Sequence, residues 1–338
     1  MMKVFFPTLH SLHHPRKDYS DGLPPFNHLE IPQRIDRLLD GLQASGITET
    51  VGVETEALEA VRQLHDPDYI DFLLSISGKI KSNHEYIPTV FRNDLSAAAL
   101  EFRGGMYCTE IGSPLGPGTV KAALNSGATA LAAADHLITS NEDVFGVCRP
   151  PGHHAGRRRY GGYCYFNNAY LAAQGLNASG RQCAVLDVDY HLGDGSLEFA
   201  NERAPYFSLH ADPWRNYPYL SNDTRYESPY VHCSVFPSGI NGDGYLLLLE
   251  ELTRMVARTH PQTAIVSLGF DTLGTDYIQD EQIYLTPKDY ALLGGVLAKL
   301  TCPILFLLEG GYDIEKLSEC GRQFIRGFLS ARDMERGC

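Results

Sequence analysis

The sequence contains no long hydrophobic run, which argues against a helical membrane protein. No apolar stretch approaches the ~20 residues that a helix needs to cross a bilayer. The N-terminal segment MMKVFFPTLHSLHHPRKDYS has an apolar core too short for a signal peptide, and it predicts a first strand instead. We therefore expect no membrane partner.

The cysteines lack any pairing pattern. Eight are present, with no CxxC motif and no disulfide-like rhythm, and several lie inside apolar strand-like runs. A buried, reduced thiol is the usual state there. The sequence therefore predicts a cytoplasmic protein.

Excess positive charge is also missing. Lys and Arg number 28 against 41 Asp and Glu, giving a formal net charge of −13. Nucleic-acid binding needs a basic surface, so we expect no nucleic-acid partner. An acidic cleft would concentrate a small cationic substrate. An ordinary acidic protein explains the charge equally well.

No linker, low-complexity segment or internal repeat interrupts the chain, so we expect one domain over 1–338. Continuous apolar runs predict strands at 3–6, 144–148, 183–189, 206–210, 231–236, 263–271 and 303–309. Helical patterns cover 32–46, 119–138, 286–300 and about 314–330. This alternation predicts an α/β fold with a parallel sheet covered by helices on both faces. Residues 76–118, rich in Gly, Pro and Tyr, predict a functional or interfacial loop.

The chemically interesting residues follow the predicted strands, where parallel sheets bind ligands. In VLDVDYHLGDG (185–195), Asp187, Asp189 and His191 would share one face of an extended strand. Such a strand end suits a divalent metal, although solvated acids would have the same spacing. Asp189, His191 and Asp271 form a three-ligand set with room for water and substrate. Zn²⁺ is the first choice; Fe²⁺, Co²⁺ and Mn²⁺ also fit these donors.

Other strand ends supply catalytic groups. One of the paired histidines, His153 or His154, could serve as general base and then protonate the leaving amine. Asp187 and Asp194 are available to fix their tautomers. Tyr312 follows the last predicted strand, and its phenol could stabilise an oxyanion. The predicted reaction class is metal-assisted amide hydrolysis.

Six motifs together resemble the histone deacetylase-like hydrolases of the arginase/deacetylase superfamily, which include the acetylpolyamine amidohydrolases. They fall in family order and are RPPGHHA (149–155), GGYCYFNNA (161–169), LDVDYHLGDG (186–195), SLHADP (208–213), SLGFDTLGTD (267–276) and EGGY (309–312). The resemblance covers nearly the whole chain. It implies one α/β domain with a central, eight-stranded parallel sheet.

The resemblance also assigns roles residue by residue. It makes Asp189, His191 and Asp271 the zinc ligands and Tyr312 the catalytic tyrosine, and it pairs His153 with Asp187 and His154, the general base and acid, with Asp194. It implies substrate contacts at Tyr163 and Tyr217 and an acetate-release channel beside Arg34. Gly162 and Glu110 are further candidate substrate-binding residues. It implies a structural K⁺ site at Asp187, Asp189, His191, Ser208 and Leu209.

Three departures from the family pattern refine these expectations. Leu192 replaces a second histidine, where we expect tuning only, and the stretch between Asp194 and Ser208 is about two residues short, which weakens a second K⁺ site. Gly112 stands where protein deacetylases carry an aspartate that holds the peptide backbone. This loss favours free acetylated amines, above all acetylpolyamines, over the alternative of acetyl-lysine in proteins.

The remaining expectations concern the 76–118 loop and the competing functions. The loop resembles an insertion that narrows the active-site mouth and forms homodimers or larger homo-oligomers. Glu101 and Glu110 within it could meet a distal ammonium group, but solvated loop acids are the favoured interpretation. An arginase-like two-metal enzyme would need more ligands than the single DxH motif supplies. A catalytically inactive binding module is disfavoured because every catalytic position is filled.

Overall fold

A computed structural model describes residues 2–20, 24–220, 228–279 and 283–336 of the chain. Its centre is one eight-stranded sheet in the order β4-β1-β5-β12-β10-β6-β7-β8, and every neighbouring pair is parallel. The strands are β1 (Lys3–Pro7), β4 (Thr50–Val53), β5 (Val144–Gly146), β6 (Cys183–Asp187), β7 (Tyr206–His210), β8 (Val231–Val235), β10 (Thr263–Leu268) and β12 (Ile304–Leu308). The expected α/β fold with a central parallel sheet is confirmed.

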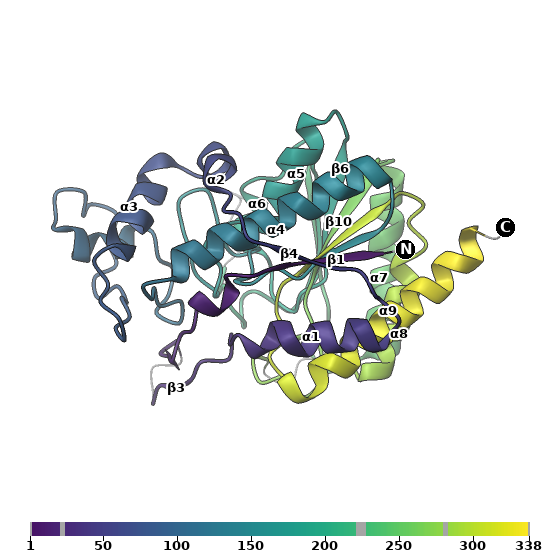
Figure 1. Ribbon diagram of the computed structural model, residues 1–338. Helices are drawn as coiled ribbons and strands as arrows, with labels where there is room; N and C mark the ends of the chain where they lie inside the picture. Colours follow the sequence, from purple (N-terminus) through teal and green to yellow (C-terminus); the bar gives the residue numbers. More distant parts are fainter. Residues whose placement is uncertain (1, 21–23, 221–227, 280–282, 337–338) are drawn as a thin grey trace.

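Helices cover both faces of this sheet (Figure 1). They are α1 (Gln33–Ala44), α2 (Leu58–Leu64), α3 (Pro67–Ser77), α4 (Thr119–Ser140), α5 (Asn168–Ala178), α6 (Asp194–Leu197), α7 (Gly242–Arg258), α8 (Pro287–Leu297) and α9 (Ile314–Arg336). Short 3₁₀ turns η1 (His10–Leu12) and η2 (Leu100–Met106) and the two-residue strands β2 (Lys17–Asp18), β3 (Phe26–Asn27), β9 (Ile240–Asn241) and β11 (Ile283–Tyr284) complete the described elements.

Two hydrophobic cores explain why the central strands carry apolar residues on both faces. Phe306 and Leu308 of β12 pack into the core beneath α1, α7, α8 and α9, whereas Leu305 and Leu307 pack into the core beneath α3, α4 and α5. Successive strand residues point to opposite faces, and both faces are buried here. These strands therefore carry apolar residues at consecutive positions, and not the alternating apolar and polar residues of a half-exposed strand.

The expected helices are present, and their ends follow local sequence signals. Thr286 and Asp289 form a capping box at the start of α8, with Pro287 in its first turn. α4 ends at Asn141, which adopts a left-handed conformation with φ of 58°.

Two strand predictions need correction. The strand expected over 183–189 ends at Asp187, so Asp189 and His191 do not share a strand face with it. Hydrogen bonds from backbone amides to aspartate carboxylates stabilise a turn there instead. The amide of Asp189 donates to Asp187 at 3.1 Å, and the amide of His191 donates to Asp189 at 2.9 Å. Edge strand β4 was missed because TVGV carries no continuous apolar run.

Residues 76–118 contain little regular structure beyond the end of α3 and the 3₁₀ turn η2. An antiparallel bridge joins Tyr86 to Leu115, and a parallel bridge joins Cys108 to Tyr160. Together with α2 and α3, this segment extends from one end of the sheet (Figure 1, left). Two residues of this segment, Thr109 and Glu110, line the main pocket of the molecule.

The seven cysteines in the described ranges are all free thiols, and five of them are buried: Cys108, Cys148, Cys164, Cys183 and Cys320. Cys338 lies outside the described residues. No helix of the described part of the chain is both long and apolar enough to cross a membrane.

Close packing of α8 on α9 predicts opposite effects for two adjacent glycines. A Cβ at Gly294 would lie 2.3 Å from the carbonyl oxygen of Phe324, whereas one at Gly295 would meet no heavy atom of the described residues within 4 Å. We expect Gly294→Ala to lower the free energy of unfolding by about 1–3 kcal/mol through overpacking. Gly295→Ala should leave it unchanged or raise it by up to about 1 kcal/mol. Urea unfolding would measure both, and equal effects would contradict this packing.

Candidate active site

The carboxyl ends of four adjacent strands build the site. β5, β12, β10 and β6 are neighbours at the centre of the sheet, although they are far apart in the sequence. The loops that follow them carry the histidine pair, Tyr312, Asp271 and the Asp189–His191 turn. Sheet order therefore brings together the residues that sequence analysis selected.

Asp189, His191 and Asp271 form a buried group whose potential ligand atoms lie within 4.8 Å of one another. Nδ1 of His191 is 3.5 Å from Oδ1 of Asp189 and 3.5 Å from Oδ2 of Asp271. Tetrahedral ligands at about 2.0–2.2 Å from a zinc ion stand about 3.3–3.6 Å apart, so the spacing fits such an ion. Oδ2 of Asp271 is buried without a hydrogen-bond partner among the described residues.

Electrostatics in this group also favours a cation. Burial and the neighbouring charge of Asp189 raise the pKa of the Asp271 carboxyl to about 7. Burial disfavours a charged His191, but its contacts with Asp189 and Asp271 outweigh that cost and raise its pKa to about 9. Two carboxylates that repel each other in a buried place are relieved by a divalent cation. The donor set and its charge therefore fit a divalent metal.

Each histidine of the pair contacts one aspartate through Nδ1. His153 lies 3.1 Å from Asp187, and His154 lies 2.7 Å from Asp194. The two rings are adjacent, with centroids 4.0 Å apart, and both are buried. Contact of each Nδ1 with a carboxylate directs Nε2 away from that partner, as a proton-transferring imidazole requires.

The environments push the two histidine pKa values apart. Burial opposes a charge on His153, but the carboxylates of Asp189 and Asp187 overcome it and hold its pKa well above the usual value. Burial, reinforced by His153, lowers the pKa of His154 to about 3. A neutral imidazole can accept a proton, so the split favours His154 as the base.

Tyr312 is held in a tight turn after β12. Its backbone amide donates to Asp276 at 2.6 Å, and the carbonyl of the preceding Gly311 accepts from Nε of Arg34 at 2.7 Å. The Arg34 guanidinium lies 4.7 Å from the centroid of the Tyr312 ring. Burial keeps the Tyr312 pKa well above 10, so the phenol remains a proton donor. A Cβ at Gly310 would fall 2.2 Å from Asp271, which explains the glycine there.

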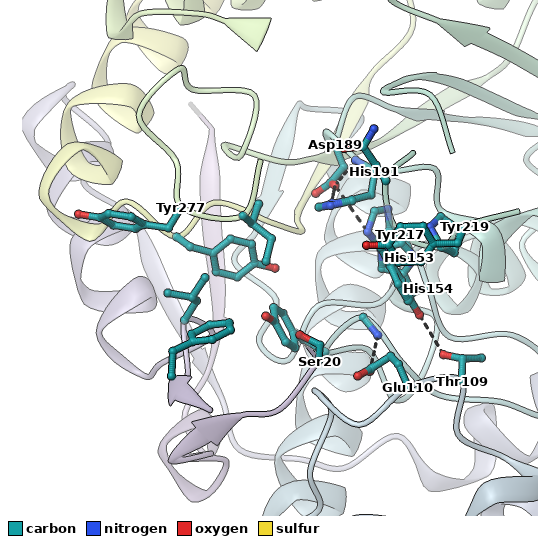
Figure 2. Close-up of a pocket in the computed structure, with 18 residues that line it drawn as sticks. Ser20, Thr109, Glu110, His153, His154, Asp189, His191, Tyr217, Tyr219 and Tyr277 are labelled. Atoms are coloured by element: carbon teal, nitrogen blue, oxygen red, sulfur yellow. Dashed lines mark hydrogen bonds and ion pairs between the residues drawn. The ribbon is translucent and has the colours of Figure 1, made fainter. Parts of the chain in front are cut away.

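His153, His154, Asp189, His191 and Tyr312 line one pocket with a volume of about 280 Å³ (Figure 2). Its wall includes the two predicted aromatic residues, Tyr163 and Tyr217, and Tyr277 lines the pocket on the side opposite the histidines. The Tyr217 ring packs edge-on against His154 with centroids 4.7 Å apart, and the Tyr163 ring packs edge-on against Tyr312 at 5.6 Å. Gly162 has φ of +53°, and a Cβ there would lie 2.3 Å from His154. Aromatic rings thus pack directly against His154 and Tyr312 in the pocket wall.

The comparisons with known proteins agree with this geometry. Residues 28–328 match the histone deacetylase domain. This chain belongs to that family. It is 34% identical over 334 residues to an acetylpolyamine amidohydrolase from Mycoplana ramosa, covering 94% of this chain and 96% of the relative. It is 32% identical over 340 residues to acetylpolyamine amidohydrolase 1 from Pseudomonas aeruginosa, covering 95% and 97%.

A solved structure gives the same result for the fold. The crystal structure of an acetylpolyamine aminohydrolase from Burkholderia pseudomallei matches with a TM-score of 0.90 at 30% identity, and the match covers 98% of this chain and 99% of that one. The chain is therefore a hydrolase of the deacetylase family, and the resemblance inferred from its six motifs is confirmed.

The loop acid Glu110 has a different setting from the solvated one that sequence reasoning allowed. It lines the pocket, but its carboxylate accepts hydrogen bonds from the Gly112 amide, the Ser113 hydroxyl and the Gly162 amide. Glu110 therefore also supports the deacetylase pocket wall. Its proposed contact with a substrate ammonium stays a prediction. Glu101 is not among the residues that line this pocket.

Three of the five residues expected to hold K⁺ lie on neighbouring strands, and the other two, Asp189 and His191, lie in the turn after β6. Asp187 of β6 pairs in register with Ser208 of β7, and Leu209 follows. The Ser208 hydroxyl is buried without a hydrogen-bond partner in the described part of the chain. An orphaned oxygen beside a buried carboxylate fits an oxygen-coordinated cation.

Sequence reasoning missed several groups that support this deacetylase site. Glu309 is fully buried, and its carboxylate accepts from the amides of Gly152 and His153 at 2.7 and 3.1 Å. Asp18 accepts from the Tyr163 phenol at 2.5 Å. Arg159 contacts Asp194. For Glu309 the sequence offers one signal, an acidic residue at the end of the apolar run PILFLLE. Asp18 and Arg159 contact residues that are distant in the sequence, so no local pattern marks them.

Glu309 allows a test of what holds the histidine pair. Glu309→Ala leaves two buried amides without an acceptor, at about 1–3 kcal/mol for each, and should lower both kcat and the free energy of unfolding. Glu309→Gln keeps one oxygen for these amides and should retain most of both. Urea unfolding and steady-state kinetics would measure the pair of variants. If both variants were equally damaged, charge rather than hydrogen bonding would be the requirement.

Proposed function

We propose that this deacetylase hydrolyses the acetamide bond of small acetylated amines. Acetylpolyamines such as acetylputrescine and acetylspermidine are the proposed substrates, and acetate and the free amine are the products. The observation that carries the proposal is that the paired histidines, Tyr312 and two members of the three-ligand group line one pocket, with the aspartates that contact the histidines buried behind them. The names of the relatives, acetylpolyamine amidohydrolases over nearly their whole length, support the substrate class.

Asp189, His191 and Asp271 would hold the metal, with Zn²⁺ as the first choice and Fe²⁺, Co²⁺ or Mn²⁺ as alternatives. When bound, the metal polarises the acetyl carbonyl and acidifies a water molecule. Asp187, Ser208 and Leu209 would hold a structural K⁺. The unpartnered oxygens of Asp271 and Ser208 support these assignments.

The chain's own groups move the protons. His154 accepts a proton from the attacking water through Nε2, because its Nδ1 is engaged by Asp194. The Tyr312 phenol donates a hydrogen bond to the oxyanion that develops on the former carbonyl oxygen. As the carbon–nitrogen bond breaks, the imidazolium returns the proton to the leaving amine. His153, held by Asp187, orients the reacting groups beside His154.

The pocket walls and rim suit a slender substrate. Tyr163 and Tyr217 would contact the aliphatic chain of the amine with their ring faces. The rim also lacks space for a carboxylate at Gly112, where a Cβ would lie 2.7 Å from Asp18 and 2.8 Å from Glu110. A peptide-holding aspartate at this position would therefore meet two acids at once, which favours free amines over acetylated proteins.

The 76–118 segment is the proposed contact for a homodimer or larger homo-oligomer. Val90, Phe91 and Phe102 are exposed apolar side chains within it. Such side chains occur at protein interfaces more than on free surfaces. The proposed compartment is the cytoplasm, in keeping with the free thiols of the described residues.

A substrate panel tests the proposal. The metal-loaded protein should hydrolyse acetylputrescine and acetylspermidine with a higher kcat/KM than an acetyl-lysine peptide, as followed by acetate release. Activity confined to the peptide would refute the substrate class. Inactivity on all three substrates would instead favour the binding module.

Two variants separate chemistry from metal binding. Tyr312→Phe removes only the phenol hydroxyl, so it should keep its metal and lose about 10²–10³-fold in kcat. Asp271→Asn keeps the shape but removes a charged ligand, so it should lose metal as well as activity. Elemental analysis and acetate release measure both effects. A Tyr312→Phe rate near that of the wild type would disprove the oxyanion role.

A further inference from the structure

Three consecutive arginines follow the histidine pair, and only the third turns toward the site. Gly156 and Arg159 are bridged in a tight turn, in which the Gly156 amide donates to the Arg159 carbonyl at 3.0 Å. Arg158 pairs instead with the exposed Asp68 at 2.6 Å, and Arg157 lies over the ring of Phe199. The turn thus separates Arg159 from its neighbours and directs it inward.

The Arg159 guanidinium binds the carboxylate that orients His154. Its Nη1 contacts Oδ2 of Asp194, and its Nη2 donates to the Asp194 carbonyl at 3.0 Å. The other carboxylate oxygen, Oδ1, lies 2.7 Å from Nδ1 of His154. One carboxylate is therefore shared between the arginine and the catalytic histidine.

A second carboxylate fixes the arginine from the outer side. Nε of Arg159 donates to Glu198 at 2.7 Å, and the other oxygen of Glu198 accepts from the Arg157 amide at 2.8 Å. A Cβ at Gly156 would lie within 2.8 Å of both Glu198 and Arg159, so glycine leaves room for the pair. The Arg159 side chain is 20% exposed, whereas that of Asp194 is 1% exposed. Glu198, Arg159, Asp194 and His154 thus form one line of contacts from the surface to the pocket.

We propose that Arg159 is a positioning residue for deacetylation, acting through Asp194 on the orientation of His154. The guanidinium binds one carboxylate oxygen and the backbone carbonyl of Asp194 at the same time, so it ties the side chain to its own backbone and limits the rotation of the carboxylate. Without Arg159, Asp194 can rotate about its side-chain bonds, and the His154 ring loses its fixed tautomer and direction. This inference rests on the proposed function, because it assigns to Arg159 a role in that same reaction.

Kinetics on acetylputrescine provides the first test. Arg159→Ala should lower kcat about 10–100-fold while KM and metal content stay near wild type, because substrate and metal contact other residues. The kcat of Arg159→Lys should lie between those of the wild type and Arg159→Ala, because an ammonium restores the charge but not the simultaneous contact with the carboxylate and the carbonyl of Asp194. Arg158→Ala, the matched control from the same turn, should behave as wild type. Millimolar guanidinium should restore activity to Arg159→Ala only, because the arginine reaches solvent.

A second readout does not depend on turnover. NMR of isotope-labelled histidine reports the tautomer of each ring, and the His154 signals are assigned from a His154→Gln variant. The wild type and Arg158→Ala should show a single His154 tautomer protonated on Nδ1, and Arg159→Ala should show a mixture. If wild type hydrolysed neither acetylputrescine nor acetylspermidine, the proposed function would be wrong, and this spectrum would still decide whether Arg159 positions His154. Unchanged His154 signals, an unchanged kcat, or lost metal in Arg159→Ala would each overturn the proposal.

Discussion

Carboxylates with almost no solvent contact lie at or just after the ends of β6, β10 and β12, and the folded state must compensate each of these charges. Asp189 accepts from the amides of His191 and Gly310, and Glu309 accepts from Gly152 and His153. These bonds offset much of the cost of burial. For Asp189 with Asp271, the remaining repulsion is best relieved by a cation. The backbone approaches these carboxylates closely, so that a Cβ at Gly269 would lie 2.4 Å from Asp189.

A cationic layer beneath the turn complements this acidic layer. Glu30 is fully buried between Arg34 and Arg149, at 3.0 and 2.7 Å. Arg34 also donates to the carbonyls of Glu309 and Gly311, so it fixes the turn that presents Tyr312. Removing one member of such a buried network leaves an uncompensated charge, which is more costly than the net value of the network. The Tyr312 phenol is therefore positioned through the backbone of its turn and the Arg34 guanidinium over its ring. Loss of Arg34, Glu30 or Arg149 would disturb this position.

The predictable part of the site is the part that sheet topology determines. Because β5, β12, β10 and β6 are adjacent, residues placed just after apolar runs had to converge. Local turn chemistry was less visible: the apolar run predicts a strand that continues to 189, yet the strand ends at Asp187, whose carboxylate accepts from the Asp189 amide. Contacts between distant loops left no periodic signal. Asp18 reaches Tyr163 across 145 positions, and Arg159 lies in a run of arginines that usually indicates a solvated surface.

The same packing links the pocket rim to the substrate. Asp18 accepts from the Tyr163 phenol and from the amide and hydroxyl of Ser20, and Glu110 is held by Gly112, Ser113 and Gly162. Both carboxylates are therefore fixed within van der Waals reach of Gly112. An aspartate at that position would add a third negative charge at a place where neither neighbour can move without releasing a pocket wall. In this chain Asp18 and Glu110 hold the pocket walls in place. They leave no space for a peptide-binding carboxylate at Gly112.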